Sequence, residues 1–180
     1  MRIISGKNKG RRITAPKNLP VRPTTDMAKE SLFNILNNQI YFDEIDVLDL
    51  FAGTGNISYE FASRGAHIIH SVDNNRHCSH FIERTAASLD YDSIHSIQSD
   101  YKYFIRHARL KWDVIFADPP YSMREIFQDL PHLIFEHQLL KENGIFVLEH
   151  SEAYSYEDHP NFYEHRHYGR VHFSFFENAK

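Results

Sequence analysis

An acid followed by two prolines and an aromatic ring, Asp118-Pro119-Pro120-Tyr121, is the run of residues in this chain best suited to chemistry. It comes directly after the apolar segment Trp112–Ala117, which is typical of a buried strand. Because proline has no backbone N–H, the strand cannot continue its hydrogen-bonded ladder through the two prolines. The pattern therefore predicts a carboxylate at the tip of a strand, held by a stiff backbone and flanked by a ring that can stack on a flat group.

These residues suit the activation of an exocyclic amine on a nucleobase. Such an amine is a poor nucleophile because its lone pair is delocalised into the ring, and hydrogen bonds accepted from both N–H groups localise that lone pair. The Asp118 carboxylate can accept one hydrogen and the Pro119 carbonyl the other, while Tyr121 stacks on the base. With an activated methyl donor, most of the remaining work is in-line positioning. An ordinary turn at the end of a strand is the structural alternative.

A second pattern, Asp49-Leu50-Phe51-Ala52-Gly53-Thr54-Gly55, predicts a strand that runs into a glycine turn. Gly53 and Gly55 have no side chain, so backbone there can approach a ligand closely. Asp73 follows about 20 residues later, at the usual position of a carboxylate that binds ribose hydroxyls. The spacing fits S-adenosylmethionine or a nicotinamide dinucleotide, although Ser58 replaces the third glycine of the dinucleotide fingerprint. The lack of a nearby lysine argues against a phosphate-binding loop, and a tight turn without a ligand is the structural alternative.

The elements that must position these residues form an alternating series from residue 45 onwards. Apolar strands alternate with amphipathic helices, which predicts an α/β fold with a mainly parallel sheet covered on both faces. The strands expected here are Val47–Phe51, His67–Val72, Ile94–Ser99, Val114–Ala117 and Ile145–Glu149. The helices expected are Ile57–Arg64, Arg76–Leu89, Tyr101–His107 and Arg124–Gln138, with Gly65 ending the first and Gly144 the last. A closing hairpin of Phe162–His167 and Arg170–Phe176 completes seven strands.

Asp100 follows the third expected strand and has two equally good interpretations. Its carboxylate is placed to contact the ring amine of an adenine at the strand end. As a lone acid before a helix, it could equally cap that helix.

The N-terminal segment is predicted to be a basic hairpin. Two short strands, Arg2–Ser5 and Arg11–Thr14, flank a turn bounded by Gly6 and Gly10. Prolines then mark a linker, and a helix should begin around Thr24-Thr25-Asp26, where any of the three side chains could cap it. We therefore expect a hairpin and linker at residues 1–23 and a ligand-binding domain at residues 24–180.

Charge is distributed unevenly along the chain. Residues 1–29 hold eight basic residues against one acid, whereas the remainder holds 12 basic and 23 acidic residues. A basic arm on an acidic body indicates a polyanionic partner, with Lys7, Lys9, Arg11 and Arg12 as the residues that would bind RNA. The alternative is that a lysine-rich terminus only aids solubility.

Composition excludes several classes of protein. A chain of 180 residues can bury one substantial core, and its single cysteine, Cys78, rules out an internal disulfide and fits a reducing compartment. No run reaches the length of a membrane span, and no secretory signal follows the basic start, so we expect a cytoplasmic protein. We also expect a monomer. Thirteen histidines include His77 and His80, but methyl transfer needs no metal and we expect none.

The chain resembles a known family. The two motifs above are similar to motifs I and IV of S-adenosylmethionine-dependent amino-methyltransferases. The N-terminal segments are more discriminating and resemble the ribosomal RNA small-subunit methyltransferase D family. They are Arg2–Gly6, Gly10–Arg12, Arg22–Asp26 and Glu30–Asn34. The resemblance covers nearly the whole chain.

This resemblance implies a Rossmann-like class I methyltransferase that uses S-adenosylmethionine, without metal, to methylate the N2 amine of a guanine in 16S ribosomal RNA or the 30S particle. Carried over by position, the donor site would comprise Phe51, Gly53, Gly55, Asp73 and Asp100, and the base site Asp118, Pro119, Pro120 and Tyr121. Arg22, Thr24 and Thr25 match an N-terminal motif that closes over the donor or the flipped base. The chain departs from the family in having Asn74 where a second acid could bind ribose. Glu149 is family-like but has no assigned role.

Three rival functions remain. Methylation of adenine N6 in DNA, or of a protein glutamine, usually goes with asparagine in place of Asp118. A nucleotide-binding oxidoreductase would need the third glycine and a separate substrate domain. An RNA-binding module without catalysis would not need to retain both motifs.

Overall fold

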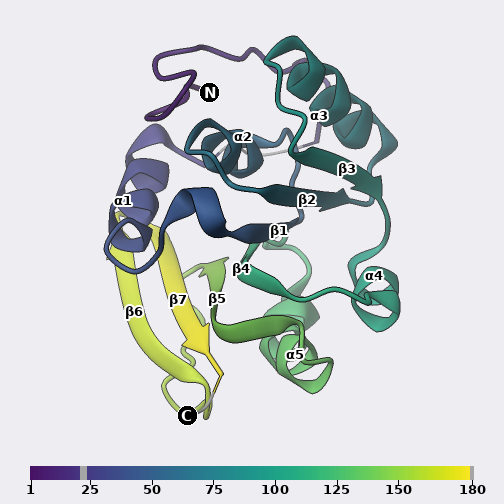
Figure 1. Ribbon diagram of the computed structural model, residues 1–180. Coiled ribbons are helices and arrows are strands. Elements are labelled where there is room, and N and C mark those ends of the chain that lie inside the picture. The colour runs from purple at the N-terminus through teal and green to yellow at the C-terminus, as the bar shows by residue number, and fades with distance from the viewer. Residues whose placement is uncertain (21–23, 179–180) are drawn as a thin grey trace.

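The sheet that the sequence predicts is present in the computed structural model, which describes residues 1–20 and 24–178 (Figure 1). Its strands are β1 (Asp46–Leu50), β2 (Ile68–Asp73), β3 (Ile94–Gln98), β4 (Trp112–Ala117), β5 (Leu140–His150), β6 (Phe162–Tyr168) and β7 (Val171–Glu177). They lie in the order β3-β2-β1-β4-β5-β7-β6. The first five pair in parallel, whereas β7 runs antiparallel to both β5 and β6. The predicted α/β class with a mainly parallel seven-stranded sheet is confirmed.

Helices cover both faces of this sheet, as predicted. They are α1 (Asp26–Leu36), α2 (Asn56–Ser63), α3 (Arg76–Ser88), α4 (Tyr101–His107) and α5 (Arg124–Glu136), with a short 3-10 turn η1 (Phe42–Glu44). Buried side chains of α1, α2 and α3 form one apolar cluster with one face of the strands, and those of α4 and α5 form a second cluster with the other face. Strand residues alternate between the clusters: Val47 belongs to the first and Leu48 to the second.

The prediction for Gly144 was wrong. Helix α5 ends at Glu136, and the left-handed residue after it is Gln138, whose φ is 51°. Gly144 lies inside β5, which begins five residues earlier than Ile145, at Leu140. A Cβ atom on Gly144 would lie 3.0 Å from the carbonyl oxygen of Trp112, next to a register shift between β4 and β5. The glycine therefore allows close backbone approach at an irregular strand pairing and does not stop a helix.

The N-terminal hairpin consists of a single antiparallel bridge between Arg2 and Arg12 and does not contain two extended strands. It is packed against α2: the Lys7 amide donates to the Ser63 carbonyl oxygen at 2.7 Å, and the Asn8 amide donates to the Ser63 hydroxyl at 3.1 Å. Ile3 and Ile13 are buried in the first apolar cluster. The hairpin is thus anchored on the body of the protein by its apolar side and by its turn.

The first helix, α1, begins at the position predicted from its candidate capping residues. The Thr25 side chain accepts a hydrogen bond from the Ala28 amide at 3.2 Å, so Thr25 is the cap among the three candidates. Within the described part of the chain, no helix combines the length and the apolar character that crossing a membrane requires.

Two glycines of the hairpin turn allow a matched test of its anchoring. Both have a positive φ, 85° at Gly6 and 83° at Gly10, but a Cβ atom would lie 1.8 Å from the Ser63 carbonyl oxygen at Gly6 and meet nothing within 4 Å at Gly10. We expect Gly10→Ala to cost about 1 kcal/mol of unfolding free energy from backbone strain alone. Gly6→Ala should cost at least about 2 kcal/mol, because the turn must also leave α2 and give up its hydrogen bonds there.

Urea unfolding gives both costs, and amide hydrogen exchange at Lys7 and Asn8 reports the anchoring directly. Faster exchange at these two amides is expected in Gly6→Ala and not in Gly10→Ala. Equal exchange in the two variants would show that the turn is not held by α2.

Candidate active site

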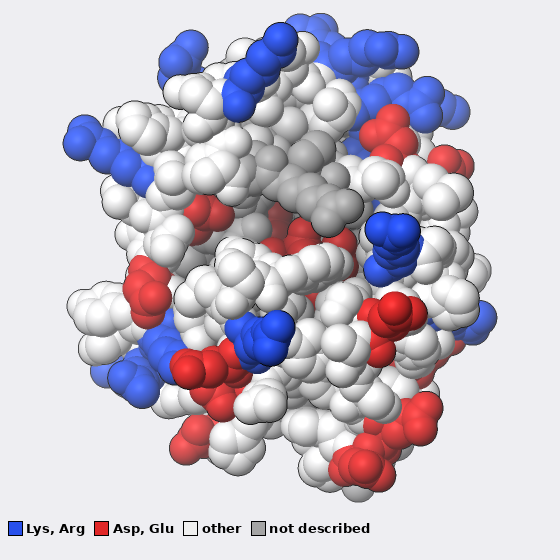
Figure 2. Space-filling view, turned by 180° about the vertical axis from the view of Figure 1, so that it is seen from behind, with Lys and Arg blue, Asp and Glu red and all other residues white. Residues whose placement is uncertain are grey.

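A cavity of about 840 Å³ opens at the carboxyl ends of the parallel strands. It lies where the strand order reverses between β1 and β4, which is the usual position of a ligand in an open α/β sheet. The start of α1 and the turn between β6 and β7 complete its wall. Seen from outside, the hollow has acidic side chains at its floor (Figure 2). Two groups of residues that are far apart in the sequence, the glycine turn and the Asp-Pro-Pro-Tyr run, therefore share one cavity.

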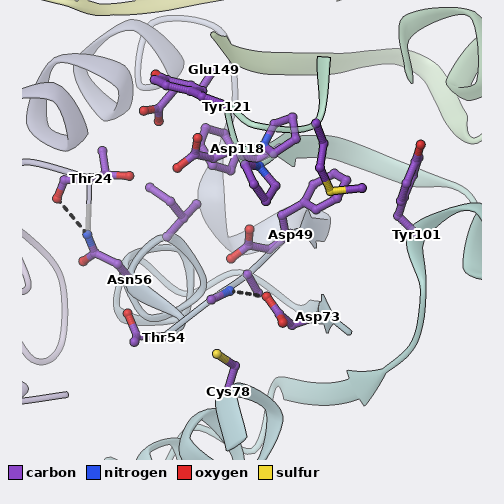
Figure 3. Close-up of a pocket in the computed structure, with 18 of the residues that line it drawn as sticks. Thr24, Asp49, Thr54, Asn56, Asp73, Cys78, Tyr101, Asp118, Tyr121 and Glu149 are labelled. Carbon is purple, nitrogen blue, oxygen red and sulfur yellow. Dashed lines mark hydrogen bonds between the residues drawn. The ribbon is translucent and has the colours of Figure 1, made fainter. Parts of the chain in front are cut away.

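The glycine turn is braced by the predicted ribose-binding acid. Asp73 Oδ2 accepts a hydrogen bond from the Gly53 amide at 2.8 Å (Figure 3). Its Oδ1 accepts one from the Asn75 amide at 2.8 Å. Phe51 and Gly53 adopt positive φ values of 61° and 57°, so the chain turns sharply at the cavity wall. A carboxylate has about four acceptor positions, so Asp73 retains the capacity to bind ligand hydroxyls.

Gly55, predicted to bind the cofactor, does not line the cavity. It is the residue before α2 and has a φ of 83°. A Cβ atom here would lie 2.7 Å from the Tyr59 ring. The structure therefore gives this glycine a role in the turn and in helix packing.

Asp100 caps a helix, which is one of its two predicted roles, and its contact with an adenine stays a prediction. Its Oδ1 accepts a hydrogen bond from the Tyr103 amide at 3.0 Å and so caps α4. It also lines the cavity, beside the rings of Phe51 and Tyr101, whose centroids are 5.1 Å apart. These rings give that part of the wall a flat aromatic character.

The Asp118–Tyr121 run forms the opposite wall. Strand β4 ends at Ala117, as predicted, and all four residues of the run line the cavity. Pro119 is buried, while Tyr121 is 41% exposed. In the close-up, Asp118, Tyr121 and Glu149 lie at one end of the cavity, and Asp73 and Cys78 lie at the other (Figure 3).

Asp49 is a cavity residue to which the sequence analysis gave no role. Its Oδ2 accepts a hydrogen bond from the Ser58 hydroxyl at 2.6 Å, and that hydroxyl lies 2.6 Å from the Ser71 hydroxyl. Burial, with smaller contributions from the nearby carboxylates of Asp118 and Asp73, raises the pKa of Asp49 to about 7, against the lowering effect of the hydrogen bonds from Ser58. Its position at the start of the glycine motif was the only sequence signal.

Lys29 is the second residue that the sequence analysis misjudged, because it was counted with the basic arm. Its side chain is 1% exposed, and burial lowers its pKa. The ammonium donates to Asn56 Oδ1 at 2.8 Å and to the Arg2 carbonyl oxygen at 2.6 Å, and it lies 3.3 Å from Glu60 Oε2. Lys29 is thus not available to a polyanion.

Glu60 joins the hairpin to the cavity wall. Its two carboxylate oxygens accept hydrogen bonds from the amides of Ile4 and Ser5 at 2.9 and 3.0 Å, and Arg64 pairs with it at 3.1 Å. Through Lys29, the same cluster reaches Asn56, whose amide donates to the Thr24 carbonyl oxygen at 3.3 Å. Thr24, Thr25 and Asn56 all line the cavity. Arg22, the third predicted residue of that motif, lies outside the described residues.

The cationic residues of the hairpin are exposed, and none of them lines the cavity. They are Lys7, Lys9, Arg11 and Arg12. The tip contacts Ser63 at the end of α2 and the Leu89 carbonyl oxygen after α3, whereas the first residue of α2, Asn56, faces the cavity. Basic side chains crowd the upper part of the face in Figure 2, away from the central hollow. The charge of the tip is therefore suited to docking at a distance and not to contact with the reacting group.

The histidines and the cysteine form no recognisable metal site. Among the described residues, no group of three or more histidine, cysteine, aspartate or glutamate side chains could hold a metal ion. Cys78 lines the cavity, but burial raises the pKa of its thiol to about 11, which keeps it protonated.

Comparison with known proteins connects this cavity to a family. The family described as "Conserved hypothetical protein 95" matches residues 1–177. The chain is 36% identical over 154 residues to "Putative rRNA methyltransferase YlbH" of Bacillus subtilis, covering 83% of this chain and 82% of that one. It is 28% identical over 149 residues to ribosomal RNA small subunit methyltransferase D of Escherichia coli, covering 83% and 74%.

A solved structure shares the fold. It is the 16S rRNA N2 methyltransferase (RsmC) of Thermus thermophilus, in complex with AdoMet and guanosine. The TM-score is 0.70 at 17% identity, over 89% of this chain and 45% of that one. At this identity the likeness concerns the fold alone.

Asp49 gives a prediction for pH dependence. The unfolded chain ionises this side chain near pH 4, whereas the folded chain keeps it protonated to about pH 7, so the unfolded state loses its proton first as pH rises. The wild type should therefore lose stability relative to Asp49→Asn across this window, by about 4 kcal/mol in total. Urea unfolding of both proteins at intervals between about pH 4 and pH 8 measures the difference.

Asp92→Asn, a change at an exposed acid, is the matched control and should follow the wild type at every pH. Parallel curves for the wild type and Asp49→Asn would show that Asp49 ionises normally.

Proposed function

Because this chain belongs to the family described as Conserved hypothetical protein 95, that of ribosomal RNA small subunit methyltransferase D, we propose that it transfers a methyl group from S-adenosylmethionine to the N2 amine of a guanine in 16S ribosomal RNA. Membership places the protein among the ribosomal RNA methyltransferases. The observation that carries the finer proposal is the cavity shared by the glycine turn and Asp118–Tyr121.

The glycine-turn side of the cavity fits the methyl donor. The described wall carries six acidic side chains and thus favours a cationic ligand, which would in turn favour ionisation of Asp49. These residues are Asp49, Asp73, Asp100, Asp118, Glu149 and Glu152. Asp73 can accept the ribose hydroxyls, and the rings of Phe51 and Tyr101 flank the space for an adenine. When bound, S-adenosylmethionine supplies an electrophilic methyl group on its sulfonium. In the relative from T. thermophilus, AdoMet and guanosine are bound in a protein of the same fold.

The Asp-Pro-Pro-Tyr side fits the base amine. Asp118 and the Pro119 carbonyl each accept one amine hydrogen, and Tyr121 stacks on the base. The localised lone pair of the amine would then be directed at the methyl group that bound S-adenosylmethionine would supply, and Asp118 would take up the amine proton. Thr24, whose carbonyl oxygen accepts a hydrogen bond from Asn56, and Thr25 border the same cavity and can close over the reactants.

The proposed function is tested by incubating the protein with labelled S-adenosylmethionine and either 30S particles, naked 16S RNA or duplex DNA. We expect label in ribosomal RNA, and N2-methylguanine in the digested product by mass spectrometry. Asp118→Ala should lower the single-turnover rate by a factor of about 10² to 10³, because a positioned acceptor is removed. Asp118→Asn should retain partial activity, because its amide oxygen still accepts one hydrogen bond.

Donor affinity, measured by calorimetry, should stay close to wild type in both Asp118 variants. Asp129→Asn removes an exposed carboxylate outside the cavity and should leave the rate unchanged. Label in DNA, or full activity of Asp118→Ala, would contradict the proposal.

The exposed charges of the hairpin should contribute to RNA binding by pairing with phosphates. Replacing Lys7, Lys9, Arg11 and Arg12 together by alanine should weaken RNA binding and flatten its salt dependence, by a slope of about one for each phosphate that is no longer neutralised. Donor affinity should not change, because none of the four lines the cavity. Filter binding at several salt concentrations measures both quantities.

The control replaces Arg106, Arg109 and Lys111, exposed residues of α4 and of the segment that joins it to β4. This triple variant should retain the wild-type slope. If the hairpin variant also retains it, RNA docks elsewhere on the protein.

A further inference from the structure

Glu149 and Asp118 occupy equivalent positions on neighbouring strands. Ala117 of β4 pairs in parallel with Leu148 of β5, so Asp118 and Glu149 follow side by side at the two strand ends. Both line the cavity and lie at the same end of it (Figure 3). Adjacent strands are about 4.8 Å apart, so side chains from two neighbouring strand ends can reach the same planar ligand.

The two carboxylates also project from the same face of the sheet. In β4, Val114 and Phe116 belong to the first apolar cluster, and Asp118 continues this alternation. In β5, Ile145 and Val147 belong to the same cluster, and Glu149 continues the alternation of that strand. Glu149 is 4% exposed and its backbone pairs with Phe173 of β7, so an acid stands where the series would otherwise place an apolar side chain. Burial of a carboxylate is costly, which indicates a role in the cavity.

Guanine offers a group that matches this second carboxylate. Its N1–H lies beside the N2 amine on the same edge of the ring, whereas the ring nitrogen beside the adenine N6 amine is an acceptor without hydrogen. If Asp118 and Pro119 accept the amine hydrogens, the neighbouring carboxylate faces the N1 position. A carboxylate there accepts a hydrogen bond from guanine and opposes the lone pair of adenine.

We propose that Glu149 is the specificity-determining residue for guanine and accepts the N1–H of the target base. The inference rests on the proposed function and deepens it. It gives the base site two carboxylates with separate tasks, Asp118 for the amine that reacts and Glu149 for the ring position that identifies the base.

The test compares guanine with 2-aminopurine, which keeps the C2 amine but has no hydrogen on N1. The methylated guanine is first mapped in wild-type product, and 30S particles are then reconstituted with 2-aminopurine at that position. For the wild type we expect kcat/KM to be about 10- to 100-fold higher on guanine, the range for a hydrogen bond to a charged group. In Glu149→Gln this ratio should fall at least about tenfold, because the amide can accept from guanine N1–H or donate to the N1 of 2-aminopurine.

The change in the ratio is the diagnostic quantity, since 2-aminopurine also lacks the guanine oxygen. Donor affinity reports that Glu149→Gln is folded, and Glu142→Gln, the same change at an exposed position of β5, should keep the wild-type ratio and rate. If Glu149→Gln does not fold, Glu149→Asp is used in its place. A wild-type ratio of kcat/KM on guanine to that on 2-aminopurine near one overturns the inference without any variant. If the product is N2-methylguanine but Glu149→Gln keeps the wild-type ratio, only the inference about Glu149 is overturned. A different methylated base overturns the proposed function as well.

Discussion

The buried contact between Lys29 and Glu60 holds together the segments that surround the cavity. Glu60 binds the backbone of the hairpin at Ile4 and Ser5, and Lys29 links it to Asn56 at the start of α2. Neither charge is exposed, so each depends on the other, and removing one partner of such a pair typically costs about 3–5 kcal/mol. Because the hairpin, α1 and α2 meet in this cluster, the order of the N-terminal segment and the shape of the cavity depend on the same contact.

The parallel sheet explains why the acids of the cavity gather at one place. Asp49, Asp118 and Glu149 lie at the ends of β1, β4 and β5, each continuing the strand positions that face α1, α2 and α3. Parallel strands end at one edge, and alternation places every second side chain on one face, so three strands deliver three acids to one cavity. Burial raises the pKa of Asp49, the most buried of the three, and the nearby carboxylate of Asp118 adds to this rise. A bound cationic donor would offset the free-energy cost of ionising Asp49.

Sequence alone determined the elements and the two motif walls of the site. Period-2 and helical apolar patterns are local, and so are the glycine turn and the proline stop, which is why β4, the turn at Gly53 and Asp118–Tyr121 lie where they were predicted. The same local logic failed at Gly144, because a glycine inside an irregular strand and one after a helix look alike in sequence. The packing of Gly55 against Tyr59, away from the cavity wall, also has no signal in the local sequence.

Only the tertiary structure decided which charged side chains are buried and which surfaces lie far from the cavity. Lys29 looks like any other cation of the basic segment until Glu60, 31 positions later, buries it. The hairpin tip proved to lie at the far end of α2 from the cavity, and the turn between β6 and β7 returned to form part of the cavity wall. Glu149 lies beside Asp118 only because of the register in which β4 and β5 pair. Periodicity records which face a residue occupies, whereas which residues meet across strands and helices is set by long-range packing that no local pattern contains.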